Sequence, residues 1–267
     1  MALPEPDIHS TCLVTGASSG IGSEIARELA RRGFGLTLVA RREERLRELA
    51  VELTAEHGVH ADPVSCDVTS EDDRRKLVTS IDDRGVTVDV LVNNAGFGSA
   101  GRFWELDSDK ELSMVRTNVE AVVAFCGTYI PRMVNRGRGA ILNVASVAGF
   151  QPVPRQATYA ASKAFVVSFT DALHTELNDT GVTATALCPG PVPTEFSDIA
   201  GIGEFDSLPS FAVTSAADTA KAAVEALDRG RRGVAPGILN TIGAAAGRVT
   251  PRTLLLPLLD RFYPVGK

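Results

Sequence analysis

The 267-residue sequence lacks the features that mark secreted, membrane-spanning and nucleic-acid-binding proteins. Its formal net charge of −6 disfavours binding to nucleic acids or to anionic membrane surfaces. It has no run of about 18 apolar residues, the length that a membrane span requires. The N-terminus, MALPEPDIHS, has two prolines and two acids and is unlike a signal peptide. We therefore expect a cytoplasmic protein without a transmembrane span.

Cysteine is scarce and shows no pattern. The four cysteines (Cys12, Cys66, Cys126 and Cys188) are widely spaced and have neither a CxxC motif nor the spacing of metal ligands. Such cysteines are typical of buried free thiols in a reducing compartment. Linkers, low-complexity tracts and internal repeats are also absent. The sequence therefore predicts a single domain over residues 1–267, without a metal site.

Short apolar runs alternate with longer amphipathic runs along most of the chain. We expect strands at residues 12–15, 36–40, 62–66, 90–93, 140–144 and 182–187. We expect helices at residues 21–32, 43–57, 71–83, 110–134, 158–177 and 216–228. The strands are continuous apolar runs, which is typical of parallel strands covered on both faces. This alternation predicts an α/β protein with a Rossmann-type, doubly wound parallel sheet.

Glycine-rich and polar stretches follow the ends of several expected strands. The first strand is followed by TGASSGIG, the fourth by NNAGFG, the fifth by Ser146 and the sixth by PGPVPT. In doubly wound sheets, ligands bind in the crevice at the carboxyl ends of the strands. We therefore expect the functional site at this edge of the sheet.

The stretch TGASSGIG has the character of a phosphate-binding loop. Gly16 permits a sharp turn, Gly20 permits close approach of a pyrophosphate, and Gly22 permits close packing of the following helix. Ser18 and Ser19 add hydroxyl donors. A glycine-rich connection without a ligand is the alternative, because short glycine patterns also occur without one.

The stretch YAASK places Tyr159 and Lys163 one helical turn apart, where their side chains are neighbours. A unit charge about 4 Å away at an effective dielectric constant of 20 contributes about 4 kcal/mol. That energy matches the lowering of about three pKa units that a phenol needs to exchange protons near neutrality. We therefore expect Lys163 to lower the pKa of Tyr159, which then serves as general acid and base. In isolation, an amphipathic helix with a solvated lysine would be the better interpretation of the pair, but it is a poor one beside Ser146 and the phosphate loop.

Together these motifs resemble those of the short-chain dehydrogenase/reductase family over about residues 10–235. The family's TGxxxGxG, NNAG, YxxxK and PGxVxT motifs are all present, and Tyr159 lies thirteen residues after Ser146. The resemblance implies a catalytic set of Asn118, Ser146, Tyr159 and Lys163. Ser146 would hold the substrate oxygen near Tyr159. Asn118 would hold a water molecule that links Lys163 to solvent.

The resemblance also implies a dinucleotide cofactor, which we expect to be NADP(H). The second strand ends in Ala40, Arg41 and Arg42, without the acid that binds the ribose hydroxyl of NAD. Arg41 can bind the 2′-phosphate as a planar fork, and Arg42 adds charge. The expected cofactor-binding residues are Gly16, Ser18, Ser19, Gly20, Ile21, Gly22, Arg41, Arg42, Asp67, Val68, Asn94, Ala95, Gly96, Tyr159, Lys163, Pro189, Gly190, Val192 and Thr194.

These expectations define an oxidoreductase that transfers a hydride between NADP(H) and a carbonyl or secondary alcohol, with reduction of an apolar ketone or ketoacyl substrate favoured. The alternatives are a catalytically idle dinucleotide-binding sensor or scaffold, and a nucleotide-sugar epimerase or dehydratase. A turnover assay separates the sensor from the enzyme. The epimerases usually have a longer C-terminal substrate domain.

Two further segments carry expectations of their own. Residues 195–211 occupy the place of the family's substrate lid. Residues 236–267 form a C-terminal extension. It could pack between subunits, cover the entrance of the substrate site or contact a membrane surface, and we favour subunit packing. The resemblance implies a homodimer or homotetramer. Six aromatic residues either form an apolar pocket or fill the core: Phe97, Trp104, Phe150, Phe196, Phe205 and Phe211.

Overall fold

The computed structural model describes residues 3–201, 213–237, 240, 247 and 250–262. At its centre is a seven-stranded sheet with the order β3-β2-β1-β4-β5-β6-β7, in which every neighbouring pair is parallel. The strands are β1 (Ser10–Thr15), β2 (Leu36–Ala40), β3 (Ala61–Ser65), β4 (Thr87–Asn93), β5 (Gly139–Val144), β6 (Val182–Leu187) and β7 (Gly233–Val234). The expected doubly wound parallel sheet is therefore confirmed.

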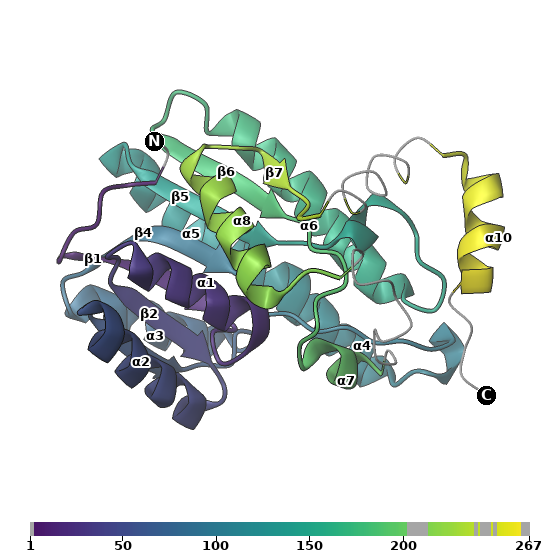
Figure 1. Ribbon diagram of the computed structural model, residues 1–267, viewed down its shortest axis with the longest axis horizontal. Coiled ribbons are helices and arrows are strands. Elements are labelled where there is room, and N and C mark those ends of the chain that lie inside the picture. Colours follow the sequence, from purple (N-terminus) through teal and green to yellow (C-terminus); the bar gives the residue numbers. More distant parts are fainter. Residues whose placement is uncertain (1–2, 202–212, 238–239, 241–246, 248–249, 263–267) are drawn as a thin grey trace.

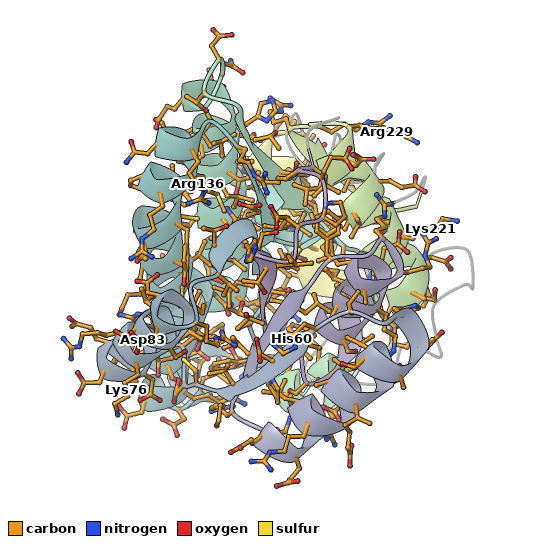
Figure 2. The ribbon with its side chains drawn as sticks, turned by 90° about the vertical axis from the view of Figure 1, so that its left-hand side faces the viewer. His60, Lys76, Asp83, Arg136, Lys221 and Arg229 are labelled. Carbon is orange, nitrogen blue, oxygen red and sulfur yellow. The ribbon has the colours of Figure 1, made fainter. Side chains whose placement is uncertain are left out.

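Helices cover both faces of the sheet (Figure 1). One face is covered by α1 (Gly20–Arg31), α2 (Glu43–His57) and α8 (Ala216–Asp228). The other face is covered by α3 (Glu71–Asp83), α5 (Ala121–Arg136) and α6 (Ala157–Glu176). Successive side chains of a strand point to opposite faces, so Leu13 packs in one core layer and its neighbours Cys12 and Val14 pack in the other. Charged side chains such as Lys76 on α3 and Lys221 on α8 point outward on opposite sides of the molecule (Figure 2).

The strand order reverses between β1 and β4. From β1 the chain proceeds outward to β2 and β3, then returns beside β1 and proceeds outward in the other direction. Such a switch point leaves a crevice at the carboxyl ends of the two central strands. The glycine-rich stretches after β1 and β4 therefore meet there, as the sequence predicts.

One expected helix differs from the structure. Residues 110–134 were predicted as a single regular helix, whereas the structure has α4 (Ser108–Val115), a π-helical segment (Arg116–Glu120) and then α5. The N–H of Ala121 donates to the carbonyl oxygen of Arg116, five residues earlier. The π-helical segment inserts a wider turn around Asn118. Helix propensity does not reveal such a turn, because no proline or glycine marks it.

Several elements of the described residues were not predicted, among them α7 (Phe196–Ala200), β7 and α10 (Arg252–Phe262). Among the described residues, none of the helices combines the length and the apolar character needed to cross a membrane. The four cysteines are free and buried, as expected.

Candidate active site

A cleft of about 610 Å³ lies along the carboxyl ends of the central strands, a volume within the usual range of small-molecule sites. It collects residues from the ends of six strands. The expected site residues that line it are Gly16, Ser18, Ser19, Gly20, Ile21, Arg41, Arg42, Asp67, Val68, Asn94, Ala95, Gly96, Ser146, Tyr159, Lys163, Pro189, Gly190, Val192 and Thr194. Two expected residues, Gly22 and Asn118, do not line the cleft and lie behind it.

The loop between β1 and α1 depends on its glycines. Gly16 and Gly20 have positive φ angles of 68° and 59°, which side chains other than glycine rarely adopt. A Cβ added to Gly20 would lie 3.1 Å from the methyl carbon of Thr194, so a side chain there would narrow the cleft. A Cβ at Gly22 would overlap the carbonyl oxygen of Gly16 and the side chain of Asn94. The loop therefore offers backbone N–H groups and the start of α1 to an anion.

The stretch after β4 is fastened to this loop by hydrogen bonds. The Thr15 hydroxyl accepts hydrogen bonds from the backbone N–H groups of Asn94 (3.0 Å) and Ala95 (3.1 Å). The side-chain amide of Asn94 donates to the carbonyl oxygens of Thr15 (2.9 Å) and Gly16 (3.1 Å). The two glycine-rich motifs thus form one rigid wall of the cleft. The motif TGASSGIG includes Thr15 but does not reveal that its hydroxyl joins the two glycine-rich stretches.

Asp67 lines the cleft after β3. Its carboxylate accepts hydrogen bonds from the backbone N–H (2.9 Å) and the hydroxyl (2.8 Å) of Thr69. Burial alone would raise the pKa of Asp67, but the hydrogen bonds from Thr69 and the charge of Arg41 outweigh it and lower the pKa. Asp67 is therefore a fixed anionic acceptor on the wall of the cleft.

Tyr159, Lys163 and Ser146 meet at the other end of the cleft. Tyr159 and Lys163 project from α6 and are buried, and Ser146 follows β5. The Ser146 hydroxyl accepts a hydrogen bond from the N–H of Ala148 (3.1 Å) and donates to the carbonyl oxygen of Pro189 (3.5 Å). The structure therefore brings the predicted serine, tyrosine and lysine together.

The expected pKa of Tyr159 is wrong. Burial raises the pKa of Tyr159 to about 12, and its hydrogen bond with Ser146 lowers it only in part. Burial also lowers the pKa of Lys163 to about 8. The Lys163 ammonium donates to the carbonyl oxygen of Val144 (2.8 Å) and lies 5.9 Å from the centre of the Tyr159 ring. The expectation counted the charge of the lysine but not the burial of both groups, and burial dominates here.

Asn118 lies behind the cleft in the π-helical segment and is almost fully buried. Its side chain accepts a hydrogen bond from the N–H of Phe97 (3.2 Å) and donates to the carbonyl oxygen of Phe97 (3.0 Å) and the hydroxyl of Ser162 (3.0 Å). Gly96 packs against both Asn118 and Lys163. Asn118 therefore lies beside Gly96 and Ser162 without facing the cleft.

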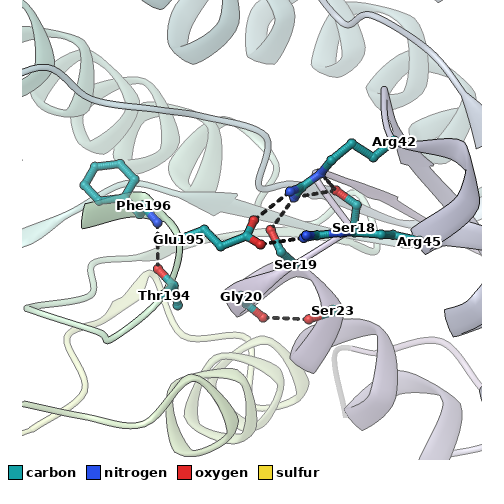
Figure 3. A network of polar contacts seen from close by, with 9 residues as sticks. All are labelled: Ser18, Ser19, Gly20, Ser23, Arg42, Arg45, Thr194, Glu195 and Phe196. Carbon is teal, nitrogen blue, oxygen red and sulfur yellow. Dashed lines mark hydrogen bonds and ion pairs between the residues drawn. The ribbon is translucent and has the colours of Figure 1, made fainter. Parts of the chain in front are cut away.

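The two arginines after β2 both line the cleft but differ in their contacts. Arg42, not Arg41, forms the polar network: its guanidinium donates to the hydroxyls of Ser18 (3.0 Å) and Ser19 (2.7 Å) and pairs with Glu195 (2.7 Å) (Figure 3). Among the described residues, the guanidinium of Arg41 forms no ion pair or hydrogen bond. Glu195 was placed in the expected lid and not in the site. Glu195 pairs with Arg42 and Arg45, a contact between distant segments that the sequence does not reveal.

The expected aromatic pocket is only partly confirmed. Phe97 and Phe196 line the cleft, and the Phe196 ring lies 5.4 Å from the Tyr159 ring. Trp104 is 77% exposed and Phe150 packs against a separate core cluster, so neither lines the cleft. Phe205 and Phe211, like most of the expected lid, lie outside the described residues.

Comparison with known proteins identifies the same family throughout. A family profile described as short chain dehydrogenase matches residues 10–201. A putative ketoacyl reductase of Streptomyces coelicolor is 46% identical over 184 residues, which are 68% of this chain and 70% of that protein. A granaticin polyketide synthase putative ketoacyl reductase of Streptomyces violaceoruber is 40% identical over 199 residues, covering 74% of this chain and 73% of that protein.

Solved structures agree with the sequence relatives. A short-chain dehydrogenase from Sphingobium yanoikuyae in complex with NADPH has a TM-score of 0.80 and 33% identity, covering 93% of this chain and 95% of that one. A variant of actinorhodin polyketide ketoreductase with NADPH has a TM-score of 0.77 and 36% identity, covering 89% and 99%. In both comparisons the match extends well beyond the segment with the sequence motifs.

Proposed function

Because the chain belongs to the short-chain dehydrogenase family, we propose that it reduces an apolar ketone or ketoacyl substrate with NADPH. It is an NADP(H)-dependent oxidoreductase that transfers a hydride between the cofactor and a carbonyl or secondary alcohol. One observation carries the proposal: Ser146, Tyr159 and Lys163 meet in the cleft that begins at the phosphate loop.

The cofactor fits the residues of the cleft. The cradle formed by Gly16 and Gly20 would bind the pyrophosphate, since side chains there would fill it. Asp67 would accept hydrogen bonds from the adenine, and Arg41 and Arg42 would bind the 2′-phosphate. Lys163 would bind the hydroxyls of the nicotinamide ribose. The bound NADPH supplies the hydride, which the protein's own side chains cannot provide.

Tyr159 would supply the proton. With a pKa of about 12, its phenol is protonated at neutral pH, which is the form that donates a proton to a developing alkoxide. The Ser146 hydroxyl, held beside it, would orient the carbonyl oxygen.

Apolar side chains support the proposed substrate class. Phe97, Phe196 and Ile199 line the cleft. The relatives from the two Streptomyces species are named as ketoacyl reductases. An alcohol dehydrogenase from Comamonas testosteroni described as specific for bulky-bulky ketones has a TM-score of 0.75 and 29% identity, covering 96% of this chain and 99% of that one. These names support a ketone with a large apolar substituent.

We also propose a cytoplasmic homodimer or homotetramer, made of one domain, with residues 195–211 as the substrate lid. Free, buried cysteines support a reducing compartment. Exposed apolar side chains on α4, α5 and α6 support a subunit contact: Leu112, Val115, Val123, Val134 and Phe165. The C-terminal extension would join such a contact, which its exposed leucines on α10 support (Leu254, Leu256 and Leu258).

A carbonyl screen tests the proposed function. Purified protein is mixed with NADPH and ketones of increasing chain length and ring number, and the loss of NADPH absorbance is followed. We expect turnover with at least one apolar ketone. Tyr159→Phe should bind NADPH as the wild type does but lose turnover by about 100-fold or more, since general acid catalysis contributes about 10²–10⁴-fold. Bound NADPH without turnover of any carbonyl, or an active Tyr159→Phe, would contradict the assignment.

A further inference from the structure

The segment after β6 is joined to the start of α2 by one carboxylate. Glu195 accepts a hydrogen bond from Arg42 on one oxygen (2.7 Å) and from Arg45 on the other (2.5 Å) (Figure 3). The two arginines are 150 or more positions away in the sequence. The same Arg42 also donates to Ser18 and Ser19 of the phosphate loop. A single anion thus bridges the mouth of the cleft.

This arrangement leaves Arg42 little capacity for a second anion. A guanidinium has five N–H donors, and Arg42 already makes one hydrogen bond to Glu195 and three to the two serines. A phosphate bound bidentately needs two of these donors. It would also lie beside the Glu195 carboxylate, and two like charges at that distance repel. Either Glu195 or the phosphate can occupy this side of Arg42, but not both.

Glu195 is adjacent to the residue that covers the proton donor. The ring of Phe196 lies 5.4 Å from the ring of Tyr159, and it also contacts the position where a Cβ of Gly98 would lie. Phe196 is the first residue of α7, so the bridge and the cover belong to one short segment. A movement of Glu195 away from the arginines would therefore displace the ring that covers Tyr159.

Building on the proposed NADP(H) site, we propose that Glu195 is an internal competitor of the 2′-phosphate. In the resting protein its carboxylate occupies the guanidinium groups of Arg42 and Arg45. A ribose 2′-phosphate that binds Arg42 displaces the carboxylate and releases α7, which uncovers Tyr159. The 2′-phosphate thereby has two effects: it binds Arg42, and by displacing Glu195 it uncovers Tyr159 for the substrate.

The competition does not depend on protonation of the carboxylate in the usual range. The hydrogen bonds from Arg45 and Arg42 lower the pKa of Glu195 to about 2, so the residue is ionised above about pH 4. The carboxylate is exposed, so its pairs with the arginines are weak enough for a phosphate to replace them.

The test measures nucleotide binding without turnover. Adenosine 2′,5′-bisphosphate and adenosine 5′-monophosphate are titrated by calorimetry into the wild type, Glu195→Gln and Glu43→Gln. Glu43 is the matched control, because it is an exposed acid next to Arg42 in sequence but pairs with Arg47. We expect Glu195→Gln to bind the bisphosphate about three- to tenfold more tightly, the size of one or two exposed ion pairs, and the monophosphate unchanged. Glu43→Gln should change neither by more than about twofold.

Hydrogen exchange of the amides of residues 196–201 supplies the second measurement. The bisphosphate should accelerate their exchange in the wild type, while Glu195→Gln should exchange fast without any nucleotide. Weaker or unchanged binding of the bisphosphate to Glu195→Gln would overturn the competition. Slower exchange on binding would instead make Glu195 a clamp on the bound nucleotide and overturn the release. Failure of the wild type to bind either nucleotide would overturn the proposed NADP(H) site itself.

Discussion

Lys163 offers a quantitative prediction, because a lysine held in a buried site affects stability as well as chemistry. Burial lowers its pKa from 10.5 to about 8. The difference of about 2.5 pKa units corresponds to about 3 kcal/mol at 1.36 kcal/mol per unit. Near neutral pH the folded protein contains the charged lysine at this cost, because the unfolded chain leaves the ammonium in water. The site residue thus destabilises the fold that holds it.

The sign of the pH dependence follows from the proton count. Between about pH 8 and pH 10.5 the unfolded state keeps the lysine proton and the folded state has lost it. The lysine contribution to the free energy of unfolding therefore increases with pH across this window. Buried Cys66 and Cys126, with pKa values raised to about 12, contribute stability below about pH 9 that is lost as the pH rises further. Because the two cysteines change the free energy of unfolding in the opposite direction, the lysine contribution has to be measured as a difference between proteins that share both cysteines.

The perturbation is Lys163→Met, measured by urea unfolding at pH 7, 8 and 9 beside the wild type and the exposed control Lys76→Met. Both cysteines remain in all three proteins, so their effect cancels in the differences. At pH 7 the free energy of unfolding of Lys163→Met should exceed that of the wild type by at most about 3 kcal/mol. This difference is reduced by about 1–3 kcal/mol, because the Val144 carbonyl oxygen loses its hydrogen-bond partner. The decisive quantity is its change with pH. The difference should shrink by about 1 kcal/mol between pH 7 and pH 9, and a constant difference would refute the reasoning.

Two other predictions concern the cofactor cleft. Arg41→Ala and Arg42→Ala should each lower the ratio of kcat/KM for NADPH over NADH by about tenfold or more, because each removes a cation from the proposed phosphate site. Equal use of both cofactors by the wild type, or an unchanged ratio in both variants, contradicts this. Gly22→Ala should lower the free energy of unfolding by about 1–3 kcal/mol, because its Cβ would overlap Gly16 and Asn94. Gly127→Ala, in open space on α5, should raise it by about 0.5–1 kcal/mol, and similar effects at both glycines would count against the packing argument.

Local patterns were sufficient to predict the sheet. Most of the six longer strands have an apolar run at their centre, although β3 is interrupted by Asp62 and Pro63. The ends of several strands carry the glycine-rich stretches, so both the fold and the edge with the site follow from the sequence. The two-residue β7 has no such pattern, because it depends on backbone pairing with Ala186 and Leu187. Strands this short are defined by their neighbours and not by their own residues.

The electrostatics of the site could not be predicted in the same way. The spacing of Tyr159 and Lys163 was sufficient to place them on one face of α6, but not to count the atoms that bury them. The pKa of each is governed by burial, a property of the packed protein. The bridge from Glu195 to Arg42 joins residues about 150 positions apart, and a single sequence carries no sign of that contact.

Asn118 lies in an irregular helical turn and is linked by hydrogen bonds to the backbone of Tyr159. On a regular α-helix each residue is rotated by about 100° from the one before, so two residues four positions apart differ in direction by about 40°. The π-helical turn is wider, and Met114, Asn118 and Val122 are all buried. The Asn118 amide donates to the hydroxyl of Ser162, which in turn donates to the carbonyl oxygen of Tyr159 (2.7 Å).

The amide of Asn118 also holds both backbone groups of Phe97, in the loop after β4. The cofactor wall and the turn of α6 that carries the phenol are therefore fixed to one another through a single side chain. The water expected between Asn118 and Lys163 stays a prediction. A Cβ on Gly96 would lie 3.0 Å from the Asn118 oxygen and 3.4 Å from the Lys163 nitrogen. A side chain at position 96 would therefore crowd both the amide and the ammonium.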